Sequence, residues 1–251
     1  MEEYIAFFDS GIGGLSVLLE CQRLLPSYNY IFFSDSKNRP LGNKTPQKIT
    51  ESAIFNIYLL KKKFNVKIIV LACNTLTSCC IDLLRKNFPD IIFVGVEPCI
   101  KLVKDLGYNK ALVISTVATA KHNKTLAKYI ENQDVLIGDR NLATLIEQNR
   151  NNIYRITPYL VEKYSRYVEK VDCVILGCTH YIFAKSLFQK IFNCPVFDSN
   201  IYVARRVGVL AMQNKIKRGC EIIFCDSNGN KEIFGYFNKI AFYSRAKYVI
   251  I

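Results

Sequence analysis

Two cysteines of this chain stand in similar sequence contexts. Cys73 lies in IIVLACNTLTS (residues 68–78) and Cys178 lies in CVILGCTHYIF (residues 173–183). In both stretches an apolar run typical of a buried strand ends on a small residue, and the cysteine is followed by polar residues that include threonine. The repetition predicts two similar structural units, each with a thiol at the end of a strand.

Two thiols that face one small ligand could form a disulfide, hold a metal, or move protons at one carbon from both sides. The third chemistry is the distinctive one, because inverting a stereocentre beside a carboxylate needs a base on one face and an acid on the other. Since a free thiol has a pKa of ~8.5, only a few per cent of it is thiolate at neutral pH. Neighbouring groups must therefore stabilise the thiolate.

Two polar residues are candidates for that help. His180 follows Cys178 by two residues, and its imidazolium form would favour a thiolate. Asp9 ends the first strand-like run and is expected on the same edge as Cys73, where it could hold that cysteine or a ligand ammonium. A turn residue is the alternative interpretation of an aspartate so close to glycine.

The glycine-rich stretch after Asp9 can also bind a ligand group. Ser10, Gly11, Gly13 and Gly14 bring backbone N–H groups to the start of a predicted helix, which is a ready site for a carboxylate. A dinucleotide fingerprint would need glycine at the position of Ser16, so we do not expect a nucleotide cofactor.

Strand-like and helical patterns alternate along the chain, and this alternation predicts an α/β fold with parallel strands. The predicted strands are Tyr4–Phe8, Tyr30–Phe33, Lys67–Leu71, Ile91–Val94, Ala111–Ile114, Val135–Ile137, Cys173–Leu176, Pro195–Phe197 and Glu221–Phe224. The predicted helices are Leu15–Leu25, Pro46–Lys63, Thr77–Asn87, Lys121–Ile130, Ile153–Val168, Tyr181–Phe192 and Val203–Lys217.

We expect two domains with mainly parallel sheets flanked by helices. Residues 1–95 together with 203–251 would form one domain, because the tail after residue 200 has elements that the second unit does not need. Residues 96–202 would form the other. Ligands of parallel sheets bind beyond the carboxyl ends of the strands, so the site is expected in the cleft between the domains.

Bulk composition limits the class of protein. The 251 residues are 50% hydrophobic and 22% charged, which is typical of a globular protein with a full core. No apolar run approaches the ~20 residues of a membrane span, and the start MEEYIAFF carries acids where a signal peptide carries Lys or Arg. We therefore expect a cytoplasmic protein whose ten cysteines are reduced.

The distribution of charge and the small number of histidines argue against a nucleic-acid-binding protein and against a metal-binding protein. The net charge is +13, but the basic residues are dispersed and the one tight run, 61–63, ends a predicted helix, so nucleic acid is not an expected partner. The chain has two histidines and no C-x-x-C pair, so no metal site is expected.

Four motifs, FDSGIGGLSVL, LACNT, VGVEP and LGCTHY, carry a resemblance over nearly the whole chain. With them the chain resembles the glutamate racemases, which belong to the aspartate/glutamate racemase superfamily. The resemblance implies two pseudo-symmetric α/β domains and a cofactor-independent interconversion of L-glutamate and D-glutamate for peptidoglycan. A homodimer is compatible with it.

The same resemblance implies roles for individual residues. Cys73 would act on the D-enantiomer and Cys178 on the L-enantiomer, with Asp9 and His180 assisting and Glu147 supporting the histidine. The implied substrate contacts are Asp9, Ser10, Leu41, Gly42, Asn74, Thr75, Thr116, Thr119, Thr179 and His180.

Departures from the family pattern keep alternatives open. Leu41 stands where family members usually have tyrosine, and Ser34 and Ser36 flank Asp35 where glycine and threonine are usual. One alternative is a racemase of the same superfamily that acts on aspartate or another amino acid. The other is a basic binding protein with a vestigial site.

Overall fold

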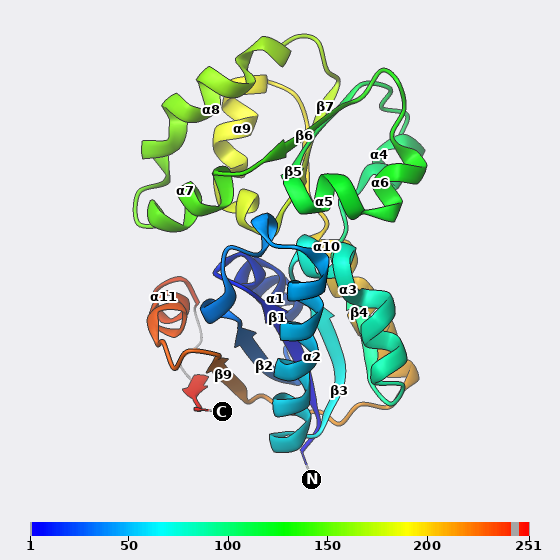
Figure 1. The fold of residues 1–251 in the computed structure, drawn as a ribbon, viewed down its shortest axis with the longest axis vertical. Coiled ribbons are helices and arrows are strands. Elements are labelled where there is room, and N and C mark those ends of the chain that lie inside the picture. Colours follow the sequence, from blue (N-terminus) through cyan, green and yellow to red (C-terminus); the bar gives the residue numbers. More distant parts are fainter. Residues whose placement is uncertain (1, 242–245, 251) are drawn as a thin grey trace.

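The computed structural model describes residues 2–241 and 246–250, which form two lobes built on parallel sheets flanked by helices (Figure 1). This architecture confirms the predicted α/β class. The larger lobe contains the six-stranded sheet and the smaller lobe contains the four-stranded sheet.

In the larger lobe the strand order is β10-β9-β2-β1-β3-β4. Its strands are β1 (Tyr4–Asp9), β2 (Asn29–Ser34), β3 (Val66–Leu71), β4 (Ile92–Gly95), β9 (Ile222–Asp226) and β10 (Ala246–Tyr248). Its helices are α1 (Gly13–Leu24), α2 (Pro46–Lys63), α3 (Asn74–Asn87), α10 (Asn200–Gln213) and α11 (Glu232–Ile240), with the short turns η1 (Ser36–Asn38) and η2 (Leu41–Asn43).

In the smaller lobe the order is β6-β5-β7-β8. Its strands are β5 (Ala111–Thr116), β6 (Val135–Asp139), β7 (Cys173–Gly177) and β8 (Val196–Phe197). Its helices are α4 (Ile100–Asp105), α5 (Val117–His122), α6 (Lys124–Tyr129), α7 (Leu142–Gln148), α8 (Thr157–Tyr164) and α9 (Lys185–Phe192), with η3 (Ile153–Ile156), η4 (Ser165–Tyr167) and η5 (Thr179–Ala184).

The two sheets share one topology. Numbering the first four strands of each lobe in chain order gives 2-1-3-4 in both, and β9 and β10 extend only the larger sheet. The third strand of each sheet, β3 or β7, leads into a cysteine, Cys73 or Cys178. The two thiols therefore occupy equivalent positions in a repeated fold.

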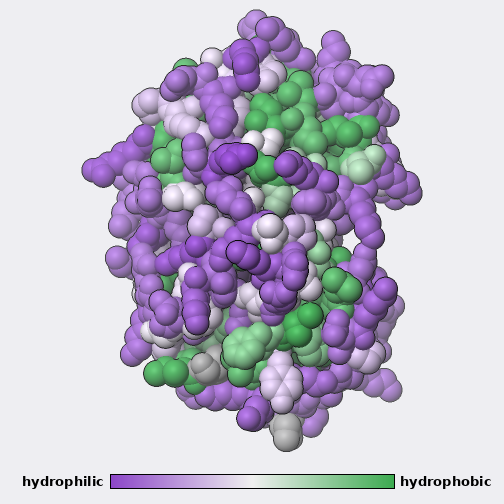
Figure 2. All heavy atoms as spheres, in the orientation of Figure 1, coloured by the Kyte–Doolittle hydropathy of each residue, from purple (hydrophilic) through white to green (hydrophobic). Residues whose placement is uncertain are grey.

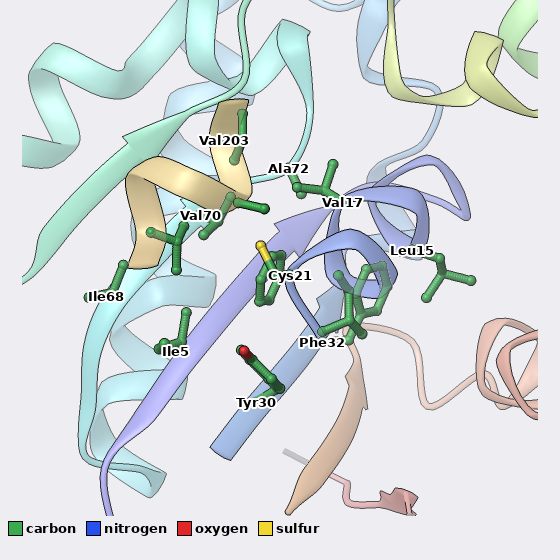
Figure 3. Close-up of a cluster of buried hydrophobic side chains, with 14 of the residues drawn as sticks. Ile5, Leu15, Val17, Cys21, Tyr30, Phe32, Ile68, Val70, Ala72 and Val203 are labelled. Atoms are coloured by element: carbon green, nitrogen blue, oxygen red, sulfur yellow. The ribbon is translucent and has the colours of Figure 1, made fainter. Parts of the chain in front are cut away.

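Strand β1 explains why the larger sheet forms. All six of its residues are buried, with Ile5 and Phe7 in the core beneath α1 and α10 and Ala6 and Phe8 in the core beneath α2 and α3. A strand covered on both faces must be apolar throughout, which is the pattern of a central parallel strand. Figure 3 shows the first of these cores, with Ile5 and its apolar neighbours packed between the sheet and the helices.

Most predicted elements are present, but three predicted helices are each divided. The helix expected over Tyr181–Phe192 is split into η5 and α9. The helix expected over residues 121–130 is wrong as one element, since the Asn123 side chain accepts a hydrogen bond from the Leu126 amide and starts a new helix there. The helix expected over 153–168 is likewise broken, with Pro158 in the first turn of α8. Elements α4, α7, α11 and β10 were not predicted.

The chain enters the smaller lobe between β4 and α4 and leaves it between β8 and α10. These two connections touch, because the Ser199 hydroxyl donates a hydrogen bond to the Glu97 carbonyl. In the described part of the chain, no helix has both the length and the apolar character to cross a bilayer. Hydrophilic residues cover most of the face drawn in Figure 2, including the waist where the lobes meet.

Candidate active site

A cavity of about 280 Å³ lies between the lobes, and Cys73 and Cys178 both line it. Cys73 precedes α3 in the larger lobe and Cys178 precedes η5 in the smaller lobe, so each thiol comes from its own sheet. The volume is near the lower end of the ~300–1,000 Å³ typical of small-molecule sites. The cavity therefore suits a ligand of amino-acid size with a thiol from each lobe beside it.

Cys73 has surroundings that favour the neutral thiol. Burial raises its pKa well above the usual value, and the electrostatic influence of Asp9 and Cys178 raises it further. The backbone N–H groups of Leu76 and Thr75 oppose this rise but do not cancel it.

Asp9 is fully buried beside the cavity. Its carboxylate accepts hydrogen bonds from the Thr179 hydroxyl at 3.2 Å and from the backbone amides of Ser10 and Gly11. Burial raises the pKa of Asp9 to about 6, although the His180 charge and these hydrogen bonds lower it. Two of the N–H groups expected to bind a ligand carboxylate, those of Ser10 and Gly11, thus donate to Asp9 in this structure.

Cys178 has a cationic neighbour. Its sulfur lies 3.9 Å from His180 Nδ1, and His180 Nε2 lies 3.0 Å from a Glu147 carboxylate oxygen. Burial lowers the pKa of His180, but the hydrogen bonds to Cys178 and Glu147 outweigh burial and raise it well above its usual value. For Glu147, burial raises the pKa, but the hydrogen bond and the charge of His180 outweigh burial, so the pKa of Glu147 lies below its usual value. Protonated His180 is suited to stabilise a thiolate at Cys178.

Two glycines allow the lobes to approach at this point. A Cβ atom added to Gly13 would lie 2.5 Å from both His180 Nδ1 and the Thr179 hydroxyl, and one at Gly11 would lie 2.6 Å from a Glu147 oxygen. Glycine at these positions therefore makes room for the histidine and its carboxylate partner.

Threonine hydroxyls join the lobes on another side of the cavity. Thr75 of the larger lobe and Thr116 of the smaller lobe are hydrogen-bonded at 2.9 Å, and Thr116 donates to Thr119 at 2.9 Å. Gly42 approaches the same place, since a Cβ added there would lie 3.0 Å from Thr116 Cβ.

The structure separates the expected site residues into two groups. The first group lines the cavity with the two cysteines and consists of Ser10, Leu41, Gly42, Thr75, Thr116, Glu147 and His180. The second group is buried just outside the cavity lining and consists of Asp9, Asn74, Thr119 and Thr179. Asn74 Nδ2 is buried and has no hydrogen-bond partner among the described residues.

Several charged residues of the cavity were missed from the sequence. They are Arg39, Asp139, Arg140, Arg150 and Glu232. Asp139 ends β6 and could have been found by the strand-end rule that found Asp9; it accepts hydrogen bonds from Tyr159 and Tyr164. The others had no local signal.

No cluster of three or more metal-ligating side chains occurs among residues 2–241 and 246–250, and all ten cysteines are free. Because Cys73 and Cys178 are not joined in a disulfide, both thiols of the cavity can act as acids and bases. Its remaining groups are hydroxyls, amides and charged side chains that can bind an amino acid.

Curated proteins similar to the chain are glutamate racemases. The protein from Clostridium botulinum is 36% identical over 250 residues, covering 94% of this chain and 96% of its own length. The protein from Clostridium perfringens is 38% identical over 240 residues, covering 90% of this chain and 92% of its own length. A comparison with models of protein families gave no match.

Solved structures with the same fold include glutamate racemases. The Escherichia coli enzyme in complex with L-glutamate has a TM-score of 0.86 at 24% identity, covering 100% of this chain and 99% of its own. The Francisella tularensis enzyme in complex with D-glutamate has a TM-score of 0.85 at 24% identity, covering 100% and 97%. An aspartate racemase from Picrophilus torridus is more distant, with a TM-score of 0.56 at 16% identity and 94% and 99% coverage.

Proposed function

The chain belongs to the glutamate racemase family, and from this premise we propose that the protein interconverts L-glutamate and D-glutamate in the cavity between its lobes. The observation that carries the proposal is the pair of equivalent thiols, Cys73 and Cys178, that line one cavity from two sheets. Such a pair can act on the two faces of one α-carbon.

The proposed reaction needs one thiolate and one thiol. With L-glutamate, the Cys178 thiolate takes the α-proton and the Cys73 thiol delivers a proton to the opposite face. With D-glutamate, the roles are exchanged. After either turnover the protonation states of the two sulfurs are interchanged, so a proton must move between them through solvent before the same direction can repeat.

The surroundings support this division. Protonated His180 lies beside Cys178, which suits a thiolate there, whereas burial and the Asp9 charge favour the neutral thiol at Cys73. The protein is thereby prepared to act on L-glutamate first. We assign assisting roles to Asp9 and His180, and to Glu147 through its contact with His180.

We propose that substrate polar groups bind the hydroxyls and amides near the thiols. Among these Asn74 is the clearest candidate, because its buried Nδ2 lacks a partner among the described residues. The other proposed contacts are Asp9, Ser10, Leu41, Gly42, Thr75, Thr116, Thr119, Thr179 and His180. At Leu41 the contact would be through the backbone, since this side chain has no polar atom.

The test is exchange of the α-hydrogen in heavy water. The protein is incubated with each enantiomer of glutamate, α-deuteration is followed by NMR, and conversion between the enantiomers is followed by circular dichroism. We expect deuteration and racemisation with both enantiomers. The same incubation is made with aspartate. Exchange with aspartate but not with glutamate would support the aspartate alternative, and no exchange with either amino acid would support the binding-protein alternative.

The remaining proposals concern the setting of the enzyme. We propose a cytoplasmic enzyme that supplies D-glutamate for peptidoglycan and can form a homodimer. We also propose that residues 1–95 with 203–251 fold as one domain and 96–202 as the other. Support comes from the membership of β9 in the larger sheet. Residues 1, 242–245 and 251 of that division lie outside the described residues.

A further inference from the structure

The carboxylate of Glu147 is shared between the two lobes. One of its oxygens lies 3.0 Å from His180 Nε2 in the smaller lobe, and the other accepts a hydrogen bond from Arg39 of the larger lobe. Arg39 belongs to the segment between β2 and α2, whereas Glu147 lies on α7. The orientation of the carboxylate toward the histidine therefore depends on a side chain from across the cleft.

This contact is part of an ion-pair network that spans the cleft twice. Arg39 also lies 3.4 Å from Glu232 on α11, and Glu232 pairs with Arg150, which follows α7. Arg150 in turn donates a hydrogen bond to the Glu147 backbone carbonyl at 2.9 Å. In Figure 1, α7 and α11 lie on the same side of the molecule, one in each lobe.

The network is partly shielded from water. The side chains of Arg39, Glu147 and Arg150 are 28%, 17% and 21% exposed. Ion pairs in such surroundings are screened less by salt than fully exposed pairs. A guanidinium also presents its donors in a fixed fork, so it orients a carboxylate as well as attracting it.

The segment that presents Arg39 is itself held in place. The Asp35 carboxylate accepts hydrogen bonds from Asn38 at 2.9 Å and from Ser52 at 2.6 Å. The Ser36 hydroxyl donates to Asp226 at 2.6 Å. Arg39 thus extends from a braced turn of the larger lobe and not from a loose loop.

We propose that Arg39 is a positioning residue that holds Glu147 across the cleft and so acts, through His180, on proton transfer at Cys178. This inference rests on the proposed racemase function. Because Arg39 and Glu147 come from different lobes, the alignment of the histidine is complete only when the lobes are together. Among the described residues, no hydrogen bond or ion pair joins Cys73 or Asp9 to Arg39, Glu147 or His180, although the His180 charge also lowers the pKa of Asp9.

The experiment compares Arg39→Met, Arg39→Lys and wild type in the full chain, with Arg23→Met as the matched control. Arg23 is an exposed arginine of α1 paired with Glu20, so its substitution also breaks an arginine–glutamate pair. The measurement is the primary isotope effect on kcat/KM for each enantiomer of glutamate deuterated at the α-carbon. The L-enantiomer reports removal of the deuteron by Cys178 and the D-enantiomer reports removal by Cys73.

We expect Arg39→Met to lower kcat/KM by about tenfold, a fraction of the ~10²–10⁴ that general acid–base catalysis supplies. Since only the Cys178 step is slowed, the isotope effect should rise with L-glutamate and fall with D-glutamate. Arg39→Lys should recover part of the loss, and Arg23→Met should match wild type.

Three outcomes would contradict the inference. They are an Arg39→Met enzyme with unchanged kinetics, isotope effects that move together for both enantiomers, and a lysine variant no better than the methionine variant. Loss of folding would be detected separately by thermal unfolding, and the lysine variant then carries the isotope test. A wild-type protein without racemase activity would instead refute the proposed function.

Discussion

The two lobes repeat one topology but surround their thiols with opposite charges. Cys178 of the smaller lobe adjoins the cationic His180, which is in turn paired with Glu147. Cys73 of the larger lobe adjoins the anionic Asp9 in a fully buried setting. The comparison teaches that a repeated fold can set the positions of two groups while the residues around them give each group a different electrostatic environment.

A second pair of residues at equivalent positions, the aspartates Asp35 and Asp139, is bound within each lobe. The second strand of each sheet is followed or ended by an aspartate, Asp35 after β2 and Asp139 in β6. Both carboxylates accept hydrogen bonds from side chains of their own lobe, including Ser52 for Asp35 and Tyr164 for Asp139. The difference between lobes is therefore concentrated at the residues beside the sulfurs.

The largest effect is expected from removing either of the two thiols that the comparison concerns. Replacing Cys73 or Cys178 with alanine removes the acid or base on one face, so each variant should lose racemisation by about 10³-fold or more. Circular dichroism of each glutamate enantiomer measures the loss. The exposed Cys220→Ala is the control and should remain active. Retained racemisation in either site variant would show that two thiols are not both required.

The second effect removes the cation from the Cys178 side. His180→Asn should lower kcat by about 10²-fold, because the thiolate loses its charged partner. Since the pKa of His180 is raised, the histidine keeps its proton at neutral pH and loses it at alkaline pH. Loss of this proton should lower the activity of the wild-type enzyme at alkaline pH. The variant has no histidine at this position, so it should lack this part of the decrease. A pH profile of kcat measures this, and an unchanged alkaline limb would contradict the assignment.

The third effect concerns the Cys73 side. Asp9→Asn should lower kcat/KM by about tenfold, a part of the contribution of acid–base groups. It should also change stability with pH. Burial raises the pKa of Asp9 from 3.8 to about 6, so its favourable contribution is full below pH 3.8 and is lost as the pH rises through about 6.

Relative to wild type, Asp9→Asn should therefore gain up to about 3 kcal/mol of unfolding free energy between pH 4 and pH 7, at ~1.4 kcal/mol for each pKa unit. Urea unfolding at the two pH values measures the difference. The exposed Asp105→Asn is the control. A constant difference between Asp9→Asn and wild type across this range would disprove a buried, titrating Asp9.

The smallest effect tests the contact between lobes. A methyl group at Gly42 would lie 3.0 Å from Thr116 Cβ, so Gly42→Ala should raise KM severalfold and cost about 1 kcal/mol of stability. Gly235→Ala on α11 is the control, because no atom of the described residues lies within 4 Å of the added methyl group. Equal KM values for the two variants would show that the approach at Gly42 does not matter for binding.

The sequence was most informative where chemistry depends on local position. Strand ends followed by Asp9, Cys73 and Cys178 could be located from apolar runs alone, since a parallel sheet places such residues on one edge. The central strands were equally clear because burial on both faces leaves a continuous apolar pattern.

The residues that escaped prediction depend on contacts between distant parts of the chain. Arg39 meets Glu147 across 108 positions, and Glu232 meets Arg39 across 193. No local pattern encodes such pairs, and α7 and α11, which present the glutamates, were themselves not predicted. The division of the helix at Asn123 did have a signal, since asparagine is a favoured first cap of a helix.

The double connection between the lobes limits how the molecule can move. Within residues 2–241 and 246–250, the polypeptide crosses between them only at the two segments joined by Ser199 and Glu97. A lobe attached at two neighbouring points rotates most easily as a rigid body about the line through them. Entry of an amino acid would then require the two lobes to rotate apart about that line. The reverse rotation would bring both sulfurs to the α-carbon in a single movement.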